Sequence, residues 1–417
     1  MVDSPIVLRC LVFGRWCTKI RDMNEEYRPT IFAEALGRKG LRIFGVIRRD
    51  RLFHQIAFGQ TGTGKSTLLL GMLRQDLANS QGFCLVDPHG DLAASVAVSA
   101  GSSVQLWNVA DHGSMLGYNP LVRISSALRP LVASGLIDTL KRQWADAWGA
   151  RMEHLLRYAL LALLERNGST LRDIVPMFLD KEFRRQVIVS VSDPQVRSFW
   201  QVEFPSMNYK TAVDGVAPIA NKIGALLAHP VVRKALCEPE QPLRFRKIMD
   251  EGKVLIVNLA KGRLGADIAN FVGGLIVSSF ANAAMSRADT PEAERKPFFL
   301  YVDEFHSFTT SAFADMLSEL RKYKLGLVLA TQYTSQLDPD VREAIFGNVG
   351  TIMSFRVGAT DAAIISKQFG ADVPSERDLL NLPNYEMYLR LMIDGTQSKP
   401  FSARTLPPDA PEIRHAA

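Results

Sequence analysis

Residues Phe58–Leu73 read FGQTGTGKSTLLLGML, and this stretch decides how the rest of the chain is interpreted. Within it, residues 59–66 match the complete pattern G-x-x-x-x-G-K-[ST]. The backbone amides of such a loop turn inward around phosphate oxygens, and the helix that follows points the positive end of its dipole at them. The apolar run before the loop and TLLLGML after it supply the expected strand and helix. The stretch therefore predicts a phosphate-binding loop that holds a nucleoside triphosphate.

Each position of this loop has an expected task. Lys65 is expected to reach the β- and γ-phosphates, and the hydroxyl of Ser66 is expected to bind Mg²⁺. The predicted cofactors are ATP and Mg²⁺. The residues expected to surround the nucleotide are Gly59, Gln60, Thr61, Gly62, Thr63, Gly64, Lys65, Ser66 and Thr67.

Several other short apolar runs resemble the one before the loop. They are continuous rather than alternating, which is typical of strands buried on both faces of a parallel sheet. Each ends in polar residues or glycine, and ligands of such sheets bind beyond the carboxyl ends of the strands. The polar residues are therefore expected to meet at one site. The runs are QIAF (55–58), FCLV (83–86), VLIV (254–257), FFLYV (298–302), GLVLA (326–330) and TIMSF (351–355).

Two of these runs end in residues suited to hydrolysis. Asp303 and Glu304 follow FFLYV. An aspartate at a buried strand end can hold Mg²⁺, and the adjacent glutamate can deprotonate the attacking water. Gln332 follows the next run and is expected to sense the γ-phosphate. Alone, an Asp-Glu pair is usually a solvated surface feature, and a glutamine is usually a polar strand cap. The phosphate loop upstream favours the catalytic interpretation.

The chain divides by pattern. The ATPase core is expected at 51–115 and 251–406, and the strand pattern lapses between them, where 116–250 is expected to be an inserted helical domain. A basic segment (1–50) and a tail (407–417) flank these parts. The fold class predicted is α/β, with a mostly parallel sheet flanked by helices and an inserted all-α domain. YEMYLRLMI and KPFSART flank DGTQS and predict a β-hairpin at the sheet edge. The helical stripe expected in the insertion is Trp144, Trp148, Met152, Leu155, Leu156, Ala159 and Leu163.

Composition and charge are consistent with a globular cytoplasmic protein. The chain has 417 residues, of which 47% are hydrophobic, and a formal net charge of +6. This basic excess suits a polyanionic partner but is weak evidence by itself. The longest apolar stretch, Phe271–Met285, is shorter than the ~20 residues that span a bilayer, so we expect a buried helix there and no membrane span.

Arg321, Lys322 and Lys324 form a basic group between the acidic pair and Gln332. Such a group is often a solvated face near the carboxyl end of a helix, where cations are favourable. Alternatively, one arginine acts across a subunit interface as an arginine finger.

The order GQTGTGKST, LVDPHGDL, LYVDEFHSF, RKYKLGLVLATQY and GTIMSFRVGATDA resembles the HerA/FtsK superfamily of RecA-like motor ATPases. Within it, the sequence is most similar to TraG/TraD-type coupling proteins of conjugation and type IV secretion. The resemblance covers roughly residues 40–406. It implies ring hexamers that move DNA through a central channel, with Lys65, Ser66, Asp303, Glu304 and Gln332 in the family's catalytic positions. Arg321 is the best match to the family's finger arginine.

The resemblance implies a DNA translocase in which ATP is hydrolysed at subunit interfaces. Cationic residues are then expected to contact DNA phosphates, and the candidates are Lys261, Arg263, Lys210 and Lys222. Coupling proteins usually carry transmembrane helices before the motor, and none is evident in this sequence. We therefore expect a cytoplasmic protein that secretion-system, relaxase or nuclease partners recruit to the inner membrane face. Two alternatives remain at this point: a secretion ATPase acting on protein substrates, and a nucleotide-gated scaffold that recruits a nuclease or relaxase.

Overall fold

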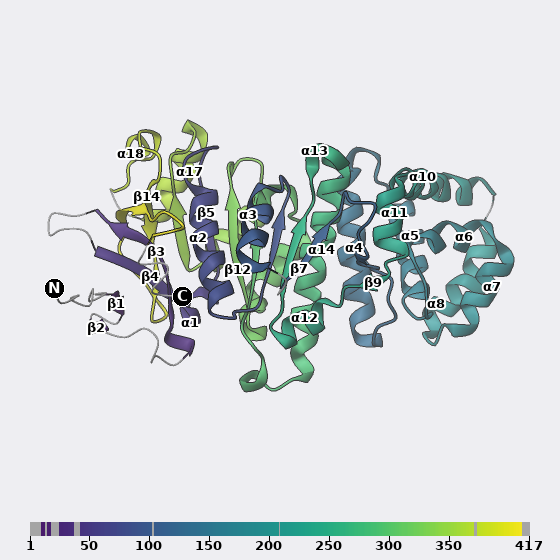
Figure 1. The fold of residues 1–417 in the computed structure, drawn as a ribbon. Helices are drawn as coiled ribbons and strands as arrows, with labels where there is room; N and C mark the ends of the chain where they lie inside the picture. The colour runs from purple at the N-terminus through teal and green to yellow at the C-terminus, as the bar shows by residue number, and fades with distance from the viewer. Residues whose placement is uncertain are drawn as a thin grey trace.

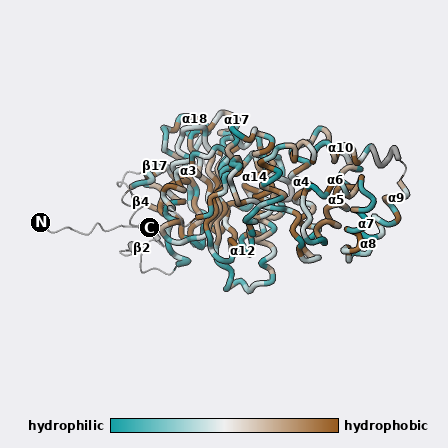
Figure 2. Tube along the Cα trace, turned by 45° about the vertical axis from the view of Figure 1, so that its right-hand side comes forward, coloured by the Kyte–Doolittle hydropathy of each residue, from teal (hydrophilic) through white to brown (hydrophobic). Residues whose placement is uncertain are grey.

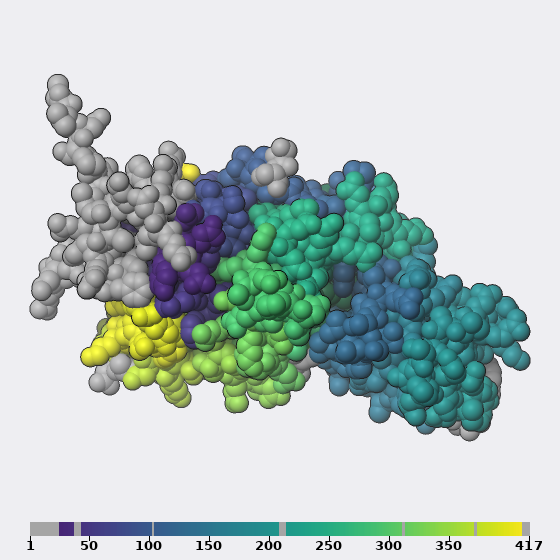
Figure 3. All heavy atoms as spheres, turned by 90° about the horizontal axis from the view of Figure 1, so that it is seen from below, coloured from purple at the N-terminus to yellow at the C-terminus, as the bar shows by residue number. Residues whose placement is uncertain are grey.

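The computed structural model describes residues 10–12, 15–17, 25–36, 42–101, 104–207, 209–370 and 373–410. These residues form an elongated molecule with a large sheet at one end and a group of helices at the other (Figure 1). Figure 3 shows the same division from below, with residues of the helical group forming a separate lobe. The predicted α/β class with a mostly parallel, helix-flanked sheet is confirmed.

The central sheet has 11 strands in the order β4-β3-β17-β14-β13-β5-β12-β11-β6-β10-β7. The run from β13 to β7 is parallel, and the run from β14 to β4 is antiparallel. All six apolar runs singled out in the sequence lie in the parallel part. The strands are β3 (Pro29–Ala35), β4 (Arg42–Ile47), β5 (Gln55–Phe58), β6 (Phe83–Asp87), β7 (Gln105–Asn108), β10 (Val254–Asn258), β11 (Phe298–Val302), β12 (Leu325–Thr331), β13 (Thr351–Ser354), β14 (Glu386–Arg390) and β17 (Phe401–Thr405).

Helices cover both faces of this sheet because successive residues of each strand point to opposite faces. On β5, Ile56 and Phe58 join one apolar cluster, whereas Ala57 joins the other. The helices of the core are α1 (Arg48–Arg51), α2 (Lys65–Ala78), α3 (Asp91–Ala100), α12 (Phe245–Glu251), α13 (Lys261–Leu264), α14 (Ala266–Met285), α15 (Ser311–Leu320), α16 (Pro339–Asn348), α17 (Ala359–Phe369) and α18 (Glu376–Leu380). Figure 2 shows the apolar strands running through the middle of this end of the molecule.

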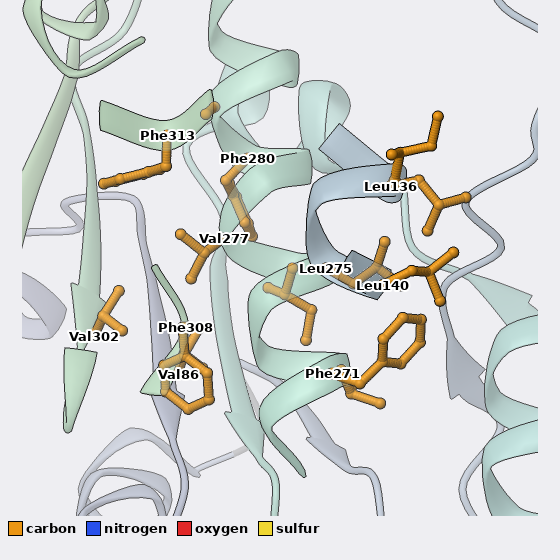
Figure 4. Packing of buried hydrophobic residues seen from close by; sticks show 14 of the residues in the cluster. Val86, Leu136, Leu140, Phe271, Leu275, Val277, Phe280, Val302, Phe308 and Phe313 are labelled. Carbon is orange, nitrogen blue, oxygen red and sulfur yellow. The ribbon is translucent and has the colours of Figure 1, made fainter. Parts of the chain in front are cut away.

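The helical group is continuous with one face of the sheet. Leu136 and Leu140 of its first helix pack beside Phe271 and Leu275 of α14 (Figure 4). The chain enters and leaves the group through two short parallel strands, β8 (Leu116–Gly117) and β9 (Gln241–Pro242). Its helices are α4 (Arg129–Gln143), α5 (Ala150–Leu163), α6 (Ile174–Leu179), α7 (Lys181–Ser190), α8 (Pro194–Ser198), α9 (Phe204–Ser206), α10 (Tyr209–Ala228) and α11 (Pro230–Cys237).

Helix α14 contains the longest apolar stretch, as expected. Residues 266–289 are long and apolar enough to cross a membrane, with a mean hydropathy of 1.5. However, 72% of that apolar window is buried inside the protein. The helix packs against α4 on one side and toward the sheet on the other (Figure 4), so burial in the core accounts for its composition.

Three local expectations differ from the structure. Trp144 and Trp148 lie in the connection between α4 and α5, because a short 3-10 turn (Ala145–Ala147) and extended Gly149 interrupt the helix. The β14–β17 hairpin does form, with Asp394 and Gly395 in its turn at positive φ, but it is not at the sheet edge. Strands β3 and β4, from the poorly patterned N-terminal segment, extend the sheet beyond it.

A buried polar cluster ties three elements of the core together. The guanidinium of Arg51, at the end of α1, donates two hydrogen bonds to Asp76 of α2, at 2.7 and 2.8 Å. It also donates to the hydroxyl of Tyr301 on β11, which in turn donates to Asp76. The neighbouring carboxylate raises the pKa of Arg51 despite complete burial. We call Arg51, Asp76 and Tyr301 the core triad.

Candidate functional site

The phosphate loop has the geometry that its sequence predicts. It connects the end of β5 to the start of α2, and the φ angles of Gly62 (77°) and Gly64 (126°) lie in the range that favours glycine. A Cβ atom at Gly59 would come within 2.7 Å of the Thr63 hydroxyl oxygen and 2.8 Å of Phe355 Cβ. Gly59 therefore lets the loop pack closely on Thr63 and Phe355, and Gly62 and Gly64 allow its left-handed turns.

Lys65 begins α2 and is largely buried. Its ammonium group donates to the carbonyl oxygens of Gly59 at 2.5 Å and Gln60 at 3.2 Å, so it lies inside the curve of the loop. Burial lowers the pKa of Lys65, while the carboxylates of Glu304 and Asp303 oppose this shift. Ser66 is exposed at the first turn of the helix. Lysine and hydroxyl are thus placed where a phosphate chain and its metal ion would lie.

The acidic pair lies at the carboxyl end of β11, on the same edge of the sheet. Asp303 and Glu304 are both only 7% exposed. Burial, together with the negative charges of Glu304 and Asp87, raises the pKa of Asp303 to about 6, and the charge of Lys65 opposes this rise. A group of carboxylates held this close out of water favours a bound cation.

Glu304 has a strained backbone and an incompletely used side chain. Its φ of 48° and ψ of 46° lie in the left-handed region, which is costly for a residue other than glycine. Its Oε1 accepts a hydrogen bond from Gln332, whereas Oε2 is buried without a hydrogen-bond partner. Oε2 lies 3.4 Å from Nδ1 of His306. This oxygen is free to accept a proton or to bind a water molecule.

Gln332 connects the acidic pair to the phosphate loop. Its amide nitrogen donates to Glu304, and its carbonyl oxygen accepts from the Thr61 hydroxyl at 3.0 Å. Three sequence motifs far apart in the chain therefore meet in one chain of hydrogen bonds. The structure brings together Lys65, Asp303, Glu304 and Gln332, which supports the assignment made from the sequence but does not test their roles.

Three further residues at this edge were not assigned from the sequence. Asp87, the last residue of β6, accepts from the backbone amides of His89 and Ala93 at 2.9 and 2.8 Å. Its position after the FCLV run was the available signal. His306 contacts the hydroxyl of Thr331 at 3.0 Å, and burial lowers its pKa. Arg142 of α4 donates to the carbonyl oxygen of His306. No local sequence pattern indicates that Arg142 reaches this loop.

Arg321 lies at the opposite end of the sheet. It starts the short turn before β12, and its guanidinium carbon is 3.4 Å from the centroid of the Phe53 ring, just before β5. Because β5 and β12 run parallel, both residues are at the amino edge, whereas the phosphate loop is at the carboxyl edge. The seven residues of β12 span roughly 20 Å, so Arg321 does not reach the phosphate loop of its own subunit.

The candidate DNA-contact residues are dispersed. Lys261 and Arg263 lie on α13, at the carboxyl edge, with Arg263 exposed and Lys261 half-buried. Lys222 is half-buried on α10, which lies on the same upper side of the molecule as α13 in Figure 1. The side chain of Lys210 lies outside the described residues.

The described residues contain no cluster of three or more His, Cys, Asp or Glu side chains with the geometry of a metal site. This agrees with the predicted donor set, because Mg²⁺ is commonly held by one or two protein oxygens, with waters and phosphate oxygens completing its shell. Ser66 and Asp303 fit that requirement.

Comparison with known proteins begins with a family model. Residues 297–378, which contain the acidic pair, Arg321 and Gln332, match the family described as "TraM recognition site of TraD and TraG". No curated protein sequence is a significant match to the chain.

Solved structures match nearly the whole chain. The plasmid coupling protein TrwB in complex with the ATP analogue ADPNP matches with a TM-score of 0.64 at 18% identity, over 88% of this chain and 89% of that one. The chain has the fold of the conjugative coupling proteins. TrwB in complex with ADP and Mg²⁺ also gives a TM-score of 0.64 at 18% identity, over 88% and 90% of the two chains. VirB4 of Thermoanaerobacter pseudethanolicus gives 0.63 at 15% identity, over 93% and 98%. The resemblance to TraG/TraD-type proteins seen in the motifs is thus confirmed in the fold and in the family match over residues 297–378.

Proposed function

We propose that this chain is an ATP-driven DNA translocase of the coupling-protein type, which hydrolyses ATP at the subunit interfaces of a ring. One observation carries the proposal: Lys65, Asp303, Glu304 and Gln332 converge at the carboxyl edge of a sheet with the coupling-protein fold. TrwB has been solved with a nucleotide and Mg²⁺, and the same ligands fit the phosphate loop here.

In this proposal, the loop amides and Lys65 hold the phosphates, while Ser66 and Asp303 hold Mg²⁺. When bound there, Mg²⁺ would neutralise charge that develops on the phosphate oxygens. Glu304 takes a proton from the attacking water through Oε2, the oxygen that has no hydrogen-bond partner. The hydrogen bond from Gln332 to Oε1 orients this carboxylate, so a general base is set before the nucleotide arrives.

Gln332 and Thr61 supply the coupling between hydrolysis and movement. Loss of the γ-phosphate changes the charge facing Thr61 and Glu304, and both contact the single Gln332 side chain. That side chain follows β12, so its displacement reaches the loop after this strand. The moving loops contact DNA phosphates, and Lys261 and Arg263 on α13 are the first candidates because they also lie at the carboxyl edge.

The direct test compares ATP hydrolysis by the wild-type protein without DNA, with single-stranded DNA and with duplex DNA, with the oligomer size recorded for each sample. Stimulation by DNA in a ring-sized assembly is the expected result. Lys65→Ala is the matched control, because it removes the phosphate contact and leaves the DNA-facing surface unchanged. Turnover that DNA does not affect, or that a protein substrate stimulates instead, would favour a secretion ATPase. Slow turnover under every condition would favour a nucleotide-gated scaffold.

A further inference from the structure

Tyr385 is an exposed aromatic residue that lies directly against the phosphate loop. The residue is 47% exposed, and its backbone amide donates to the carbonyl oxygen of Thr63 at 2.7 Å. A Cβ atom placed on Gly64 would meet both Cα and Cδ1 of Tyr385 at 3.2 Å. The edge of the tyrosine ring is therefore in contact range of Gly64, the residue just before helix α2, while nearly half of the residue is exposed.

The strand order shows on which side of the phosphate loop Tyr385 lies. On one side of β5 lie β12 and β11, which carry Gln332 and the acidic pair. The γ-phosphate end of a nucleotide points to that side, because hydrolysis takes place there. The nucleoside end must leave the loop on the other side of β5, over β13 and β14. Tyr385 immediately precedes β14 and is the exposed aromatic residue among the described residues 355–370 and 373–406.

The backbone around Tyr385 is held in place on both sides. Its φ of 69° is in the left-handed region, which an aromatic residue rarely adopts. Its carbonyl oxygen accepts from the amide of Thr405 at 2.8 Å. The guanidinium of Arg356 donates to the carbonyl oxygen of Leu382 at 3.0 Å and to the side chain of Asn384 at 2.9 Å, which fixes the preceding residues. A strained residue whose backbone is fixed in this way keeps the point of attachment of its ring in place before any ligand binds.

We propose that the ring of Tyr385 is the stacking surface for the nucleobase of the bound nucleotide. This inference rests on the proposed function, since it takes the phosphate loop as the site of the triphosphate. Stacking uses the face of a base and is tolerant of its identity, because every base has a π-face. The tyrosine therefore adds affinity for the nucleoside part of the ligand without selecting between adenine and guanine.

The test measures binding of three ligands in the presence of Mg²⁺: a non-hydrolysable ATP analogue, the corresponding GTP analogue and inorganic tripolyphosphate. Tyr385→Ala should weaken the binding of both nucleotide analogues by about 5- to 100-fold, the range expected for the loss of one base stack. Binding of tripolyphosphate should not change, because that ligand has no base. Tyr385→Phe should restore most of the nucleotide affinity, because the ring remains.

Two further variants separate stacking from backbone effects. Tyr385→Asn suits the left-handed backbone but lacks the ring, so it should weaken nucleotide binding as much as Tyr385→Ala does. Tyr333→Ala removes a similarly exposed tyrosine that follows Gln332 on the γ-phosphate side, and it should leave the affinity for nucleotides unchanged.

Equal loss of tripolyphosphate and nucleotide binding in Tyr385→Ala would mean that the residue only shapes the phosphate loop, and the inference would be overturned. Unchanged nucleotide affinity in Tyr385→Ala would overturn it as well, while the proposed function would stand. If the wild-type protein bound neither nucleotide, both the proposed function and the stacking surface would be wrong.

Discussion

The two edges of the central sheet differ in how their charged and titratable side chains are bonded. At the carboxyl edge, carboxylates crowd together, an oxygen of Glu304 has no hydrogen-bond partner, and Ser66 is exposed. At the amino edge, both ring nitrogens of buried His54 are bonded, to the Leu317 carbonyl at 3.2 Å and the Leu327 amide at 3.1 Å, and Arg321 stacks on Phe53. Glu304 and Ser66 at the carboxyl edge can therefore still bind a ligand, whereas His54 and Arg321 at the amino edge already have partners within the chain.

This difference also separates the residues assigned to catalysis. Lys65, Asp303, Glu304 and Gln332 share the carboxyl edge, but Arg321 does not, so its proposed role as an arginine finger requires a second subunit. The predictions below test whether the amino edge takes part in catalysis at all.

The largest effect is expected for Arg321→Ala. An arginine finger is worth roughly 10³–10⁵ in rate, so this variant should bind ATP, keep its fold and hydrolyse almost none. The rate of the wild-type protein per subunit should rise steeply with protein concentration, because the site is complete only after assembly. Both quantities are measured by steady-state ATP hydrolysis over a dilution series.

A mixing experiment distinguishes a finger from a structural arginine. An Arg321→Ala subunit keeps its own Glu304, and a Glu304→Gln subunit keeps its own Arg321. Mixed rings then contain some interfaces with both groups intact, and their activity should exceed that of either variant alone. If mixed rings form and remain inactive, Arg321 serves only its own subunit through the contact with Phe53.

Glu304→Gln tests the carboxyl edge by itself. Loss of a general base should reduce the rate of ATP hydrolysis by about 100-fold or more, while ATP stays bound. Binding is measured by calorimetry and turnover by phosphate release. Turnover close to that of the wild type would mean that another residue is the general base. The unpartnered Oε2 of Glu304 would then have no catalytic role.

The two edges should also respond to acid with opposite signs. Burial lowers the pKa of His54 from 6.5 to about 4, so the unfolded chain takes up this proton first. The contribution of His54 to the free energy of unfolding is complete above pH 6.5, and it falls by about 3 kcal/mol as the pH decreases toward 4. The pKa of Asp303 is raised from 3.8 to about 6, so the folded protein takes up this proton first. Its contribution to the free energy of unfolding therefore increases as the pH falls from 6 to 3.8.

Denaturant unfolding from pH 7 to pH 4 measures this contrast. His54→Asn suits the positive φ of 64° and cannot titrate, so its stability should fall less with acid than that of the wild type. Asp303→Asn should lose the compensating gain, and its stability should fall more. If the free energy of unfolding changed with pH in the same way for the wild type and both variants, the opposite pH dependences assigned to His54 and Asp303 would be wrong.

The smallest effect is expected in DNA binding. Affinity for duplex DNA should fall steeply with salt, with a log–log slope of roughly −0.9 per phosphate contact. Removing one contact, by Lys261→Ala or Arg263→Ala on α13, should reduce that slope by about one unit. Lys322→Ala, an exposed lysine near the amino edge, is the matched control and should leave the slope unchanged. If all three variants changed the salt dependence equally, DNA binding could not be assigned to the carboxyl edge.

The sequence predicted six of the seven parallel strands because their signals are local, and it missed β7, which is not a continuous apolar run. A buried parallel strand is a continuous apolar run, and its end is marked by polar residues, so β5, β6, β10, β11, β12 and β13 and the meeting of Lys65, Glu304 and Gln332 all followed. Strands β3 and β4 were not recognised as such runs, and they are defined by long-range pairing, β3 with β17 and β4 with β3. Tyr385 reaches Gly64 through the placement of β14 beside β13, which no short pattern records.

The core triad limits which elements can move relative to one another. A fully buried arginine that shares two hydrogen bonds with Asp76, with Tyr301 bonded to both, joins the helix after the phosphate loop to the strand before the acidic pair. Breaking a buried ion pair of this kind costs about 3–5 kcal/mol, a large part of the free energy that one ATP can deliver. The two halves of the site therefore form one stiff body. In the proposed translocase, mechanical work would be done by parts attached to this body, such as the loop after Gln332, the helical group and the contacts between neighbouring subunits.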